Sequence, residues 1–188
     1  MWKKYVISLL VAILVMMIIP ISPMATDIQL TNREDILKFM ENAYFAQSSL
    51  SEMDRSMDEI DFILDPYFSN DYKRSFLDSN IFEENGKFTT YGTDFGQYYI
   101  PYHRFSSNTN IVIEQSQIYL FEYFPKNNEG PVGYEDHYEG ILIEKIEGEW
   151  KISKYLYNDI PQKIIDKAEN QVIAQFERRI NDRFTLLL

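Results

Sequence analysis

The sequence predicts an α+β domain in which N-terminal helices pack on a curved antiparallel sheet and a last helix closes the chain. Three observations predict it. Apolar residues first recur every three or four positions, as on one side of a helix. The middle of the chain is then rich in the aromatic and β-branched residues that favour strands. Helical spacing returns after Pro161. Helices followed by a run of strands are typical of the α+β class.

The N-terminal segment, residues 1–25, has the pattern of an export signal. Lys3 and Lys4 precede a long apolar stretch. Pro20 and Pro23 break a helix and favour cleavage as a signal peptide. The uncharged span 5–25 is also long enough to cross a bilayer, which needs about 20 apolar residues, so a retained anchor is the alternative. Lysines before the apolar stretch place the bulk of the chain outside the membrane.

Residues 26–188 have the length of a single domain. The chain has no cysteine, which excludes disulfides and a thiolate nucleophile. Without the two lysines of the leader, the net charge of −11 becomes −13. Such an acidic surface repels phosphate backbones, so we expect no nucleic-acid partner. The expected location is extracellular or the outer face of the cytoplasmic membrane, with membrane contact only through residues 5–25 if they are not cleaved.

Capping residues mark the starts of the first helices. Thr31 and Glu34 form the pattern of a capping box ahead of an amphipathic helix from about Arg33 to Leu50. Ser56 and Glu59 repeat that pattern ahead of a second, shorter helix. Each box satisfies amide groups that a helix start leaves free. The sequence therefore predicts two successive helices with defined first turns.

Turn residues divide the next part of the chain. Asp65-Pro66 ends the second helix, because the residue before proline avoids helical dihedral angles. Ser69 is the expected cap of a third helix, and Asn85-Gly86 marks a turn after it. Glycines and Pro101 interrupt the extended residues that follow, so short strands and irregular loops are expected between residues 88 and 102.

Three strands are predicted in the second half of the chain. Gln117–Phe124 is the first, and the other two, Tyr138–Ile146 and Trp150–Tyr157, form a hairpin with a turn at Glu147-Gly148. Alternation in the last strand predicts that its apolar residues share one core face; they are Trp150, Ile152 and Leu156.

The last helix begins near Asp159-Ile160-Pro161, since proline suits a first helical turn. It carries an apolar stripe that we expect to cover a face or an edge of the sheet: Ile165, Ala168 or Glu169, Val172, Phe176 and Ile180.

This order of elements resembles the nuclear-transport-factor-2-like fold, a cone in which a curved sheet wraps around a long N-terminal helix. The resemblance covers roughly residues 31–157 and includes the closing strand Gly148-Glu149-Trp150-Lys151-Ile152. It implies a cavity at the wide end of the cone. Fold alone does not imply a function.

Four short patches resemble an uncharacterised family of exported proteins from Bacillus-type bacteria, a domain of unknown function. They are Tyr91-Gly92-Thr93-Asp94-Phe95, Tyr99-Ile100-Pro101-Tyr102, Glu129-Gly130-Pro131-Val132-Gly133-Tyr134 and Gly148-Glu149-Trp150-Lys151-Ile152. This resemblance implies a location and a fold, and it carries no activity over to this chain.

His137 is the first candidate for chemistry. In an extended chain it shares one face with Glu135 and Glu139, so it could act as a general base or join the two carboxylates around a cation. Asp94, between two glycines, could orient it. The alternatives are a strand-end histidine with ordinary hydrogen bonds and an aspartate in a turn. The spacing matches no zinc signature and no cofactor fingerprint, so we expect neither metal nor cofactor.

Aromatic density around His103, the other histidine of the chain, predicts a hollow for a ligand. We expect six residues to line it: Tyr98, Tyr99, Tyr102, His103, Tyr134 and His137. A packed, tyrosine-rich corner of the core is the alternative.

These residues favour a non-enzymatic binding or interaction domain that faces the cell envelope. Its ligand would be an envelope protein, a peptide or a small molecule. The alternative is a pocket hydrolase or isomerase with His137 as general base and Asp94 or Glu135 to orient it. A third hypothesis is a structural protein that acts only through its partner. The interaction hypothesis predicts an exposed apolar patch, and the enzyme hypothesis predicts a histidine that is bonded to a carboxylate and open to a pocket.

Overall fold

The structure is a computed structural model that describes residues 28–91, 96–100, 108–129 and 133–185, with side chains described up to residue 180. The predictions made for Asp94, Tyr102, His103 and the leader therefore lie outside the described residues. Across those described ranges, every helix is too short or too polar to cross a membrane.

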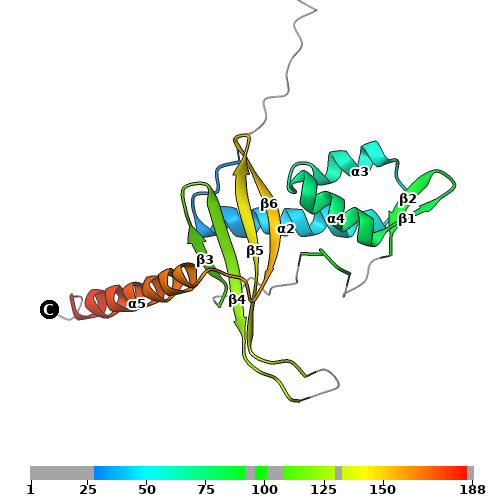
Figure 1. Cartoon of the computed structure of the whole chain (residues 1–188). Coiled ribbons are helices and arrows are strands. Elements are labelled where there is room, and N and C mark those ends of the chain that lie inside the picture. Colours follow the sequence, from blue (N-terminus) through cyan, green and yellow to red (C-terminus); the bar gives the residue numbers. More distant parts are fainter. Residues whose placement is uncertain (1–27, 92–95, 101–107, 130–132, 186–188) are drawn as a thin grey trace, which may run out of the picture.

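Helices and one small hairpin form the first half of the described chain (Figure 1). A long helix and a single 3-10 turn come first, two shorter helices follow, and a two-stranded hairpin comes last. They are α2 (Arg33–Ser48), η1 (Ser49–Ser51), α3 (Met57–Leu64), α4 (Asn70–Asn80), β1 (Ile81–Glu84) and β2 (Lys87–Thr90). The hairpin turns at Asn85-Gly86, as expected, with both residues at positive φ.

A four-stranded antiparallel sheet and a last helix form the second half. The sheet has the order β3-β4-β5-β6. Its strands are β3 (Asn110–Ile113), β4 (Gln117–Phe124), β5 (His137–Ile146) and β6 (Glu149–Tyr157), and the helix is α5 (Gln162–Thr185). Helices packed on an antiparallel sheet confirm the α+β class.

Side-chain caps begin the first three helices. Ser56 accepts from the Glu59 amide at 3.3 Å and Glu59 accepts from the Ser56 amide at 2.7 Å, which confirms that capping box. The prediction for α2 is wrong by one residue. Asn32 is its cap, and its Oδ1 accepts from the amide of Asp35 at 3.0 Å. An asparagine side chain is as good a cap as threonine, and here it lies at the helix start.

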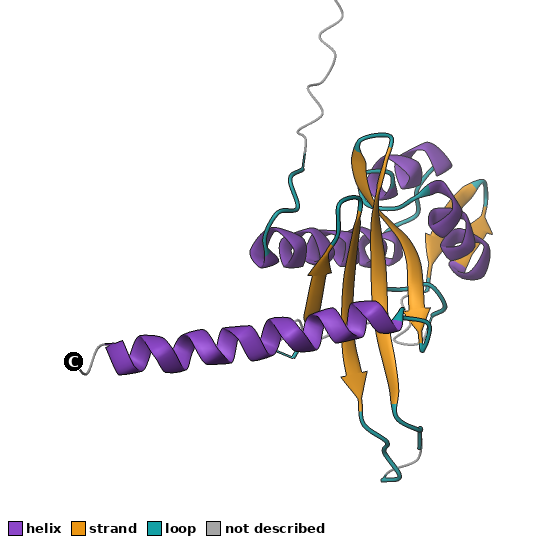
Figure 2. Ribbon diagram, turned by 60° about the vertical axis from the view of Figure 1, so that its left-hand side comes forward, coloured by secondary structure: helices purple, strands orange, loops and turns teal. Residues whose placement is uncertain are grey.

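The sheet lies between two hydrophobic cores. On β4, Ile118 and Leu120 pack in the core that α2, α3 and α4 cover. Tyr119 and Phe121 pack in a second core under the first turns of α5. Figures 1 and 2 show α2 behind the sheet and α5 crossing its other face. Both faces are covered, which explains why β4 is apolar on both sides.

A β-bulge in β6 moves its last apolar residue to the opposite face. Leu142 pairs with Lys154 and the next residue, Ile143, pairs with Ile152, so Ser153 is an extra residue in the ladder. Trp150 and Ile152 therefore lie in the core of α2, whereas Leu156 lies in the core of α5. The prediction that all three share a face is wrong for Leu156, because one extra residue inverts the alternation.

The last helix is longer than the sheet is wide. Its 24 residues span about 36 Å, while the outer strands of a four-stranded sheet are about 14 Å apart. Ile165 and Ala168 are buried on the sheet as expected, but Val172, Phe176 and Ile180 are exposed. The prediction that the whole stripe covers the sheet is therefore wrong for these three. Figure 2 shows the helix running past the sheet edge.

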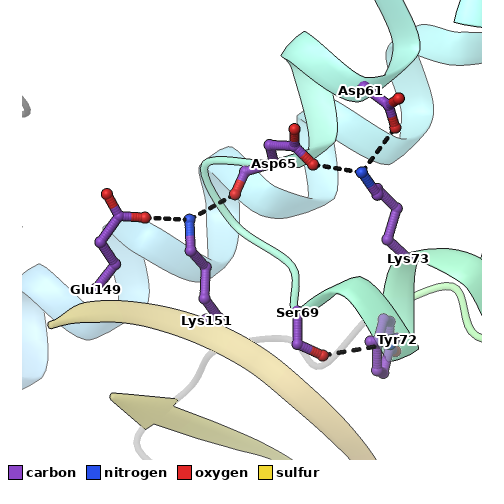
Figure 3. A network of polar contacts seen from close by, with 7 residues as sticks. All are labelled: Asp61, Asp65, Ser69, Tyr72, Lys73, Glu149 and Lys151. Atoms are coloured by element: carbon purple, nitrogen blue, oxygen red, sulfur yellow. Dashed lines mark hydrogen bonds and ion pairs between the residues drawn. The ribbon is translucent and has the colours of Figure 1, made fainter. Parts of the chain in front are cut away.

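Lysine side chains tie α3 to its neighbours (Figure 3). Lys73 of α4 bridges the carboxylates of Asp61 and Asp65, with the Asp61 contact at 2.7 Å. Lys151 of β6 donates to the backbone oxygen of Asp65 at 2.6 Å and pairs with Glu149 at 2.7 Å. These contacts fix the position of α3 against α4 and the sheet.

Candidate functional site

His137 begins β5, and both of its ring nitrogens are bonded. Nδ1 lies 2.8 Å from the backbone oxygen of Glu135, and Nε2 lies 2.9 Å from a carboxylate oxygen of Glu139. The ring is only 6% exposed. Alternation along β5 brings Glu139 to the same face, two residues on. The carboxylate beside His137 is thus that of Glu139, while the Glu135 carboxylate pairs with Lys126 at 2.7 Å.

Aromatic rings surround His137. The ring of Phe124, its partner across the β4–β5 ladder, lies nearly parallel at 5.4 Å between centroids. Tyr157 lies 4.8 Å away, and Tyr134 is edge-on at 5.2 Å. The structure therefore brings together two of the residues expected to line the hollow, His137 and Tyr134, as one packed cluster.

Glu139 links this cluster to further polar groups. It accepts a hydrogen bond from the hydroxyl of Tyr155, and burial together with the Glu139 charge raises the pKa of Tyr155. Glu139 lies opposite Glu122 in the β4–β5 ladder, and the Glu122 carboxylate accepts a hydrogen bond from the Thr109 hydroxyl. Two glutamates opposite each other repel, and the hydrogen bonds to each offset that repulsion.

Tyr98 and Tyr99 lie elsewhere, against α2 and α4. The backbone oxygen of Tyr98 accepts from Gln47 at 2.9 Å and from the Tyr72 hydroxyl at 3.1 Å. The ring of Tyr99 packs on Phe76, 5.0 Å between centroids. Burial, followed by the charges of Tyr155 and Tyr98, raises the pKa of Tyr72. Tyr98 thus contacts α2 and α4 while its side chain is 41% exposed, whereas the ring of Tyr99 packs on α4.

An apolar groove on the outer side of α2 and α3 is the more open feature. Its cavity volume is about 460 Å³. The ring of Phe62 is 83% exposed and that of Phe45 is 57% exposed. Both line the groove, together with Asn42, Ala46, Ile63, Pro66 and Tyr67. We call this feature the α2–α3 groove.

The α2–α3 groove was not predicted, although the sequence contains a signal for it. Phe45 and Phe62 fall outside the apolar stripes of their helices, whose buried members are residues such as Ala46 and Ile60. A large aromatic residue on the polar face of an amphipathic helix has no core to enter, which makes it a candidate for a partner.

Acidic residues flank Phe62. Asp58 and Glu59 lie four and three positions before it in α3, and so on the same side of the helix. Asp65 follows three positions later. Glu59 caps α3 and Asp65 pairs with Lys73, so it is the charge of Asp58 that favours an apolar segment carrying basic residues. In the part of the chain that the structure describes, no three histidine, aspartate or glutamate side chains are grouped to hold a metal ion.

Comparison with known proteins identifies a domain within this chain. No curated protein and no solved structure matches it. The resemblance to the nuclear-transport-factor-2-like cone and the bacterial origin therefore stay predictions. One family model does match, from the cap of α2 to the end of β4, a span that contains the α2–α3 groove and ends before His137. Residues 32–124 thus form a domain of the family described as "Protein of unknown function (DUF3993)".

Proposed function

We propose that this protein is a non-enzymatic binding module whose α2–α3 groove receives an apolar, basic segment of a partner protein. One observation carries the proposal: two phenylalanines, Phe62 at 83% and Phe45 at 57% exposure, line one groove. Burying a phenylalanine ring stabilises a complex by about 1.5–3 kcal/mol. Two such anchors in a groove are typical of the residues that dominate binding energy.

The flanking charges specify the partner further. Asp58 lies beside Phe62 and is exposed, and the whole chain has a net charge of −11. Lysine or arginine on the bound segment would gain from that field and would be attracted from a distance. A groove between two helices suits a helical or extended segment that inserts alternate apolar side chains.

The place of action is part of the proposal. The lysine-led apolar leader supports a domain that works outside the membrane, with an envelope protein or peptide as its partner. Sequencing the N-terminus of the protein from medium and from membranes tests this. Full-length chain found only in the cytosol would contradict the location and leave the groove proposal standing.

A peptide selection tests the α2–α3 groove. Random peptides displayed on phage are selected on the purified full chain. We expect the selected peptides to combine aromatic or aliphatic residues with lysine or arginine, and to lose binding when Phe62→Asp is introduced. The matched control is Phe82→Asp, because Phe82 is 47% exposed but lies on β1, outside the groove. Peptides that bind both variants equally well, or a selection without enrichment, would overturn the proposal.

The enzymatic alternative has one observation in its favour, the Glu139 carboxylate 2.9 Å from Nε2 of His137. A general base also needs a nitrogen that can reach the substrate. Here the other nitrogen, Nδ1, is bonded to the Glu135 backbone and the ring is 6% exposed. The geometry therefore supports binding better than catalysis.

A further inference from the structure

The second half of α5 carries an apolar stripe that nothing in the described chain covers. We call residues 169–185 the α5 extension, because the helix there has passed the edge of the sheet (Figure 2). Its exposed apolar side chains are 37–65% accessible and recur at three- and four-residue spacing; they are Val172, Ile173, Phe176 and Ile180. Side chains at this spacing form one continuous face of a helix.

The α5 extension exposes the kind of face that usually stabilises a helix. In proteins, most helical stability comes from packing an apolar face against another element. The α5 extension has such a face but no partner element within the described chain. A covering partner would both stabilise the extension and bury its apolar face.

Charge and symmetry point to the occupant. In an antiparallel pair of α5 helices centred on Phe176, residues equally far from 176 lie level with each other. Val172 then lies level with Ile180, and Glu169 lies level with Arg183. A parallel pair would instead set Glu169 against Glu169. Both arrangements match apolar with apolar, but only the antiparallel one also sets acid level with base.

We propose that the α5 extension pairs with the same extension of a second copy, antiparallel and centred on Phe176. The contact is isologous and closes as a dimer. In this arrangement the sheet-bound first halves of the two α5 helices lie at opposite ends of the pair. The helices that line the α2–α3 groove lie on the other side of the sheet from α5 (Figures 1 and 2). This proposal is independent of the proposed function.

Cysteine cross-linking tests the pairing directly, because the chain has no cysteine of its own. Single variants of the full chain are expressed in bacterial cells, oxidised before lysis and separated on a non-reducing gel. Phe176→Cys should form a disulfide dimer, because Phe176 meets its own copy. By effective concentration, it should cross-link at least about tenfold faster than Ala174→Cys, which lies on the opposite side of the helix.

A second pair of variants fixes the direction. In the antiparallel dimer two copies of residue 172 are about 12 Å apart along the axis, beyond the reach of a disulfide. Val172→Cys alone should therefore form no disulfide and run as a monomer on the non-reducing gel, and Val172→Cys co-expressed with Ile180→Cys should cross-link. Efficient dimers of Val172→Cys alone would indicate a parallel pair and overturn the proposal, as would equal cross-linking of Phe176→Cys and Ala174→Cys or none at all.

The mass of the purified chain gives an independent reading. Sedimentation should show a dimer for the wild type and a monomer for Phe176→Asp, with the near-ultraviolet circular dichroism of a folded core retained in both. A wild-type monomer, or binding of the extension to lipid vesicles that needs Phe176 while the chain stays monomeric, would contradict the second copy as occupant.

Discussion

Gln47 shows how one buried polar side chain positions a segment far away in sequence. It lies on the core side of α2 and is 0% exposed. Its Oε1 accepts from the Ile100 amide at 2.8 Å, and its Nε2 donates to the Tyr98 oxygen at 2.9 Å. Both ends of its amide thus satisfy backbone groups of segment 96–100. Its place on the apolar side of α2 follows from helical spacing, but its partners, about 50 residues away, do not.

Gln47→Leu tests this role. Leucine fills similar space but leaves the buried amide of Ile100 without an acceptor, which should reduce the free energy of unfolding by about 2 kcal/mol. Urea denaturation followed by tryptophan fluorescence measures it. The control is Gln171→Leu, an exposed position on α5, which should change stability by less than about 0.5 kcal/mol. Equal effects of the two substitutions would contradict the role given to Gln47.

At the scale of elements, sequence patterns located most helices and strands because their causes are local. The capping box at Ser56 and the hairpin turn at Glu147-Gly148 depend on residues a few positions apart, and both are confirmed. The Ser153 bulge and the exposed end of α5 depend on how strands and helices meet. Periodicity within one element contains no information about such contacts, so both were missed.

Replacing Lys73 tests how much a polar network contributes to holding α3 in place. The Lys73 side chain is only 14% exposed and it bridges Asp61 and Asp65. Replacing it by methionine should leave α3 without its link to α4 and lower the free energy of unfolding by about 1–2 kcal/mol, measured in urea. The matched control is Lys38→Met, which removes an exposed ion pair with Glu41 and should cost under about 0.5 kcal/mol.

The stability difference between wild type and Lys73→Met has a defined dependence on pH. Burial lowers the pKa of Lys73, but the hydrogen bonds and charges of Asp61 and Asp65 outweigh it, so the pKa lies above its ordinary 10.5. A raised folded-state pKa adds stability that is fully present below 10.5 and lost as the pH rises through the raised value. The stability difference between wild type and Lys73→Met should therefore stay constant from about pH 6 to 9. A decline within that range would contradict the bridge.

At the scale of the whole molecule, the sheet supports two separate surfaces. The α2–α3 groove lies on the side of the sheet that α2, α3 and α4 cover. The α5 extension continues the helix that covers the other side. Tyr134 and His137 could be placed together from sequence because they are neighbours at the start of a strand. Phe45 and Phe62 are neighbours only because α2 and α3 pack together, which sequence spacing does not specify.

The two halves of α5 should respond differently to the same kind of substitution. Ile164 is 1% exposed in the core under α5, so Ile164→Ala should cost about 2–5 kcal/mol through the cavity that it leaves. Ile173 is 56% exposed, so in dilute protein Ile173→Ala should change stability by less than about 0.5 kcal/mol.

If α5 pairs with a second copy, the cost of Ile173→Ala should grow as the protein concentration rises, because dimer formation stabilises the folded chain. The cost of Ile164→Ala should not depend on concentration in the same way. Urea midpoints of both variants and the wild type at low and high concentration measure this, and a concentration-independent Ile173→Ala would mean that the extension has no second copy against it.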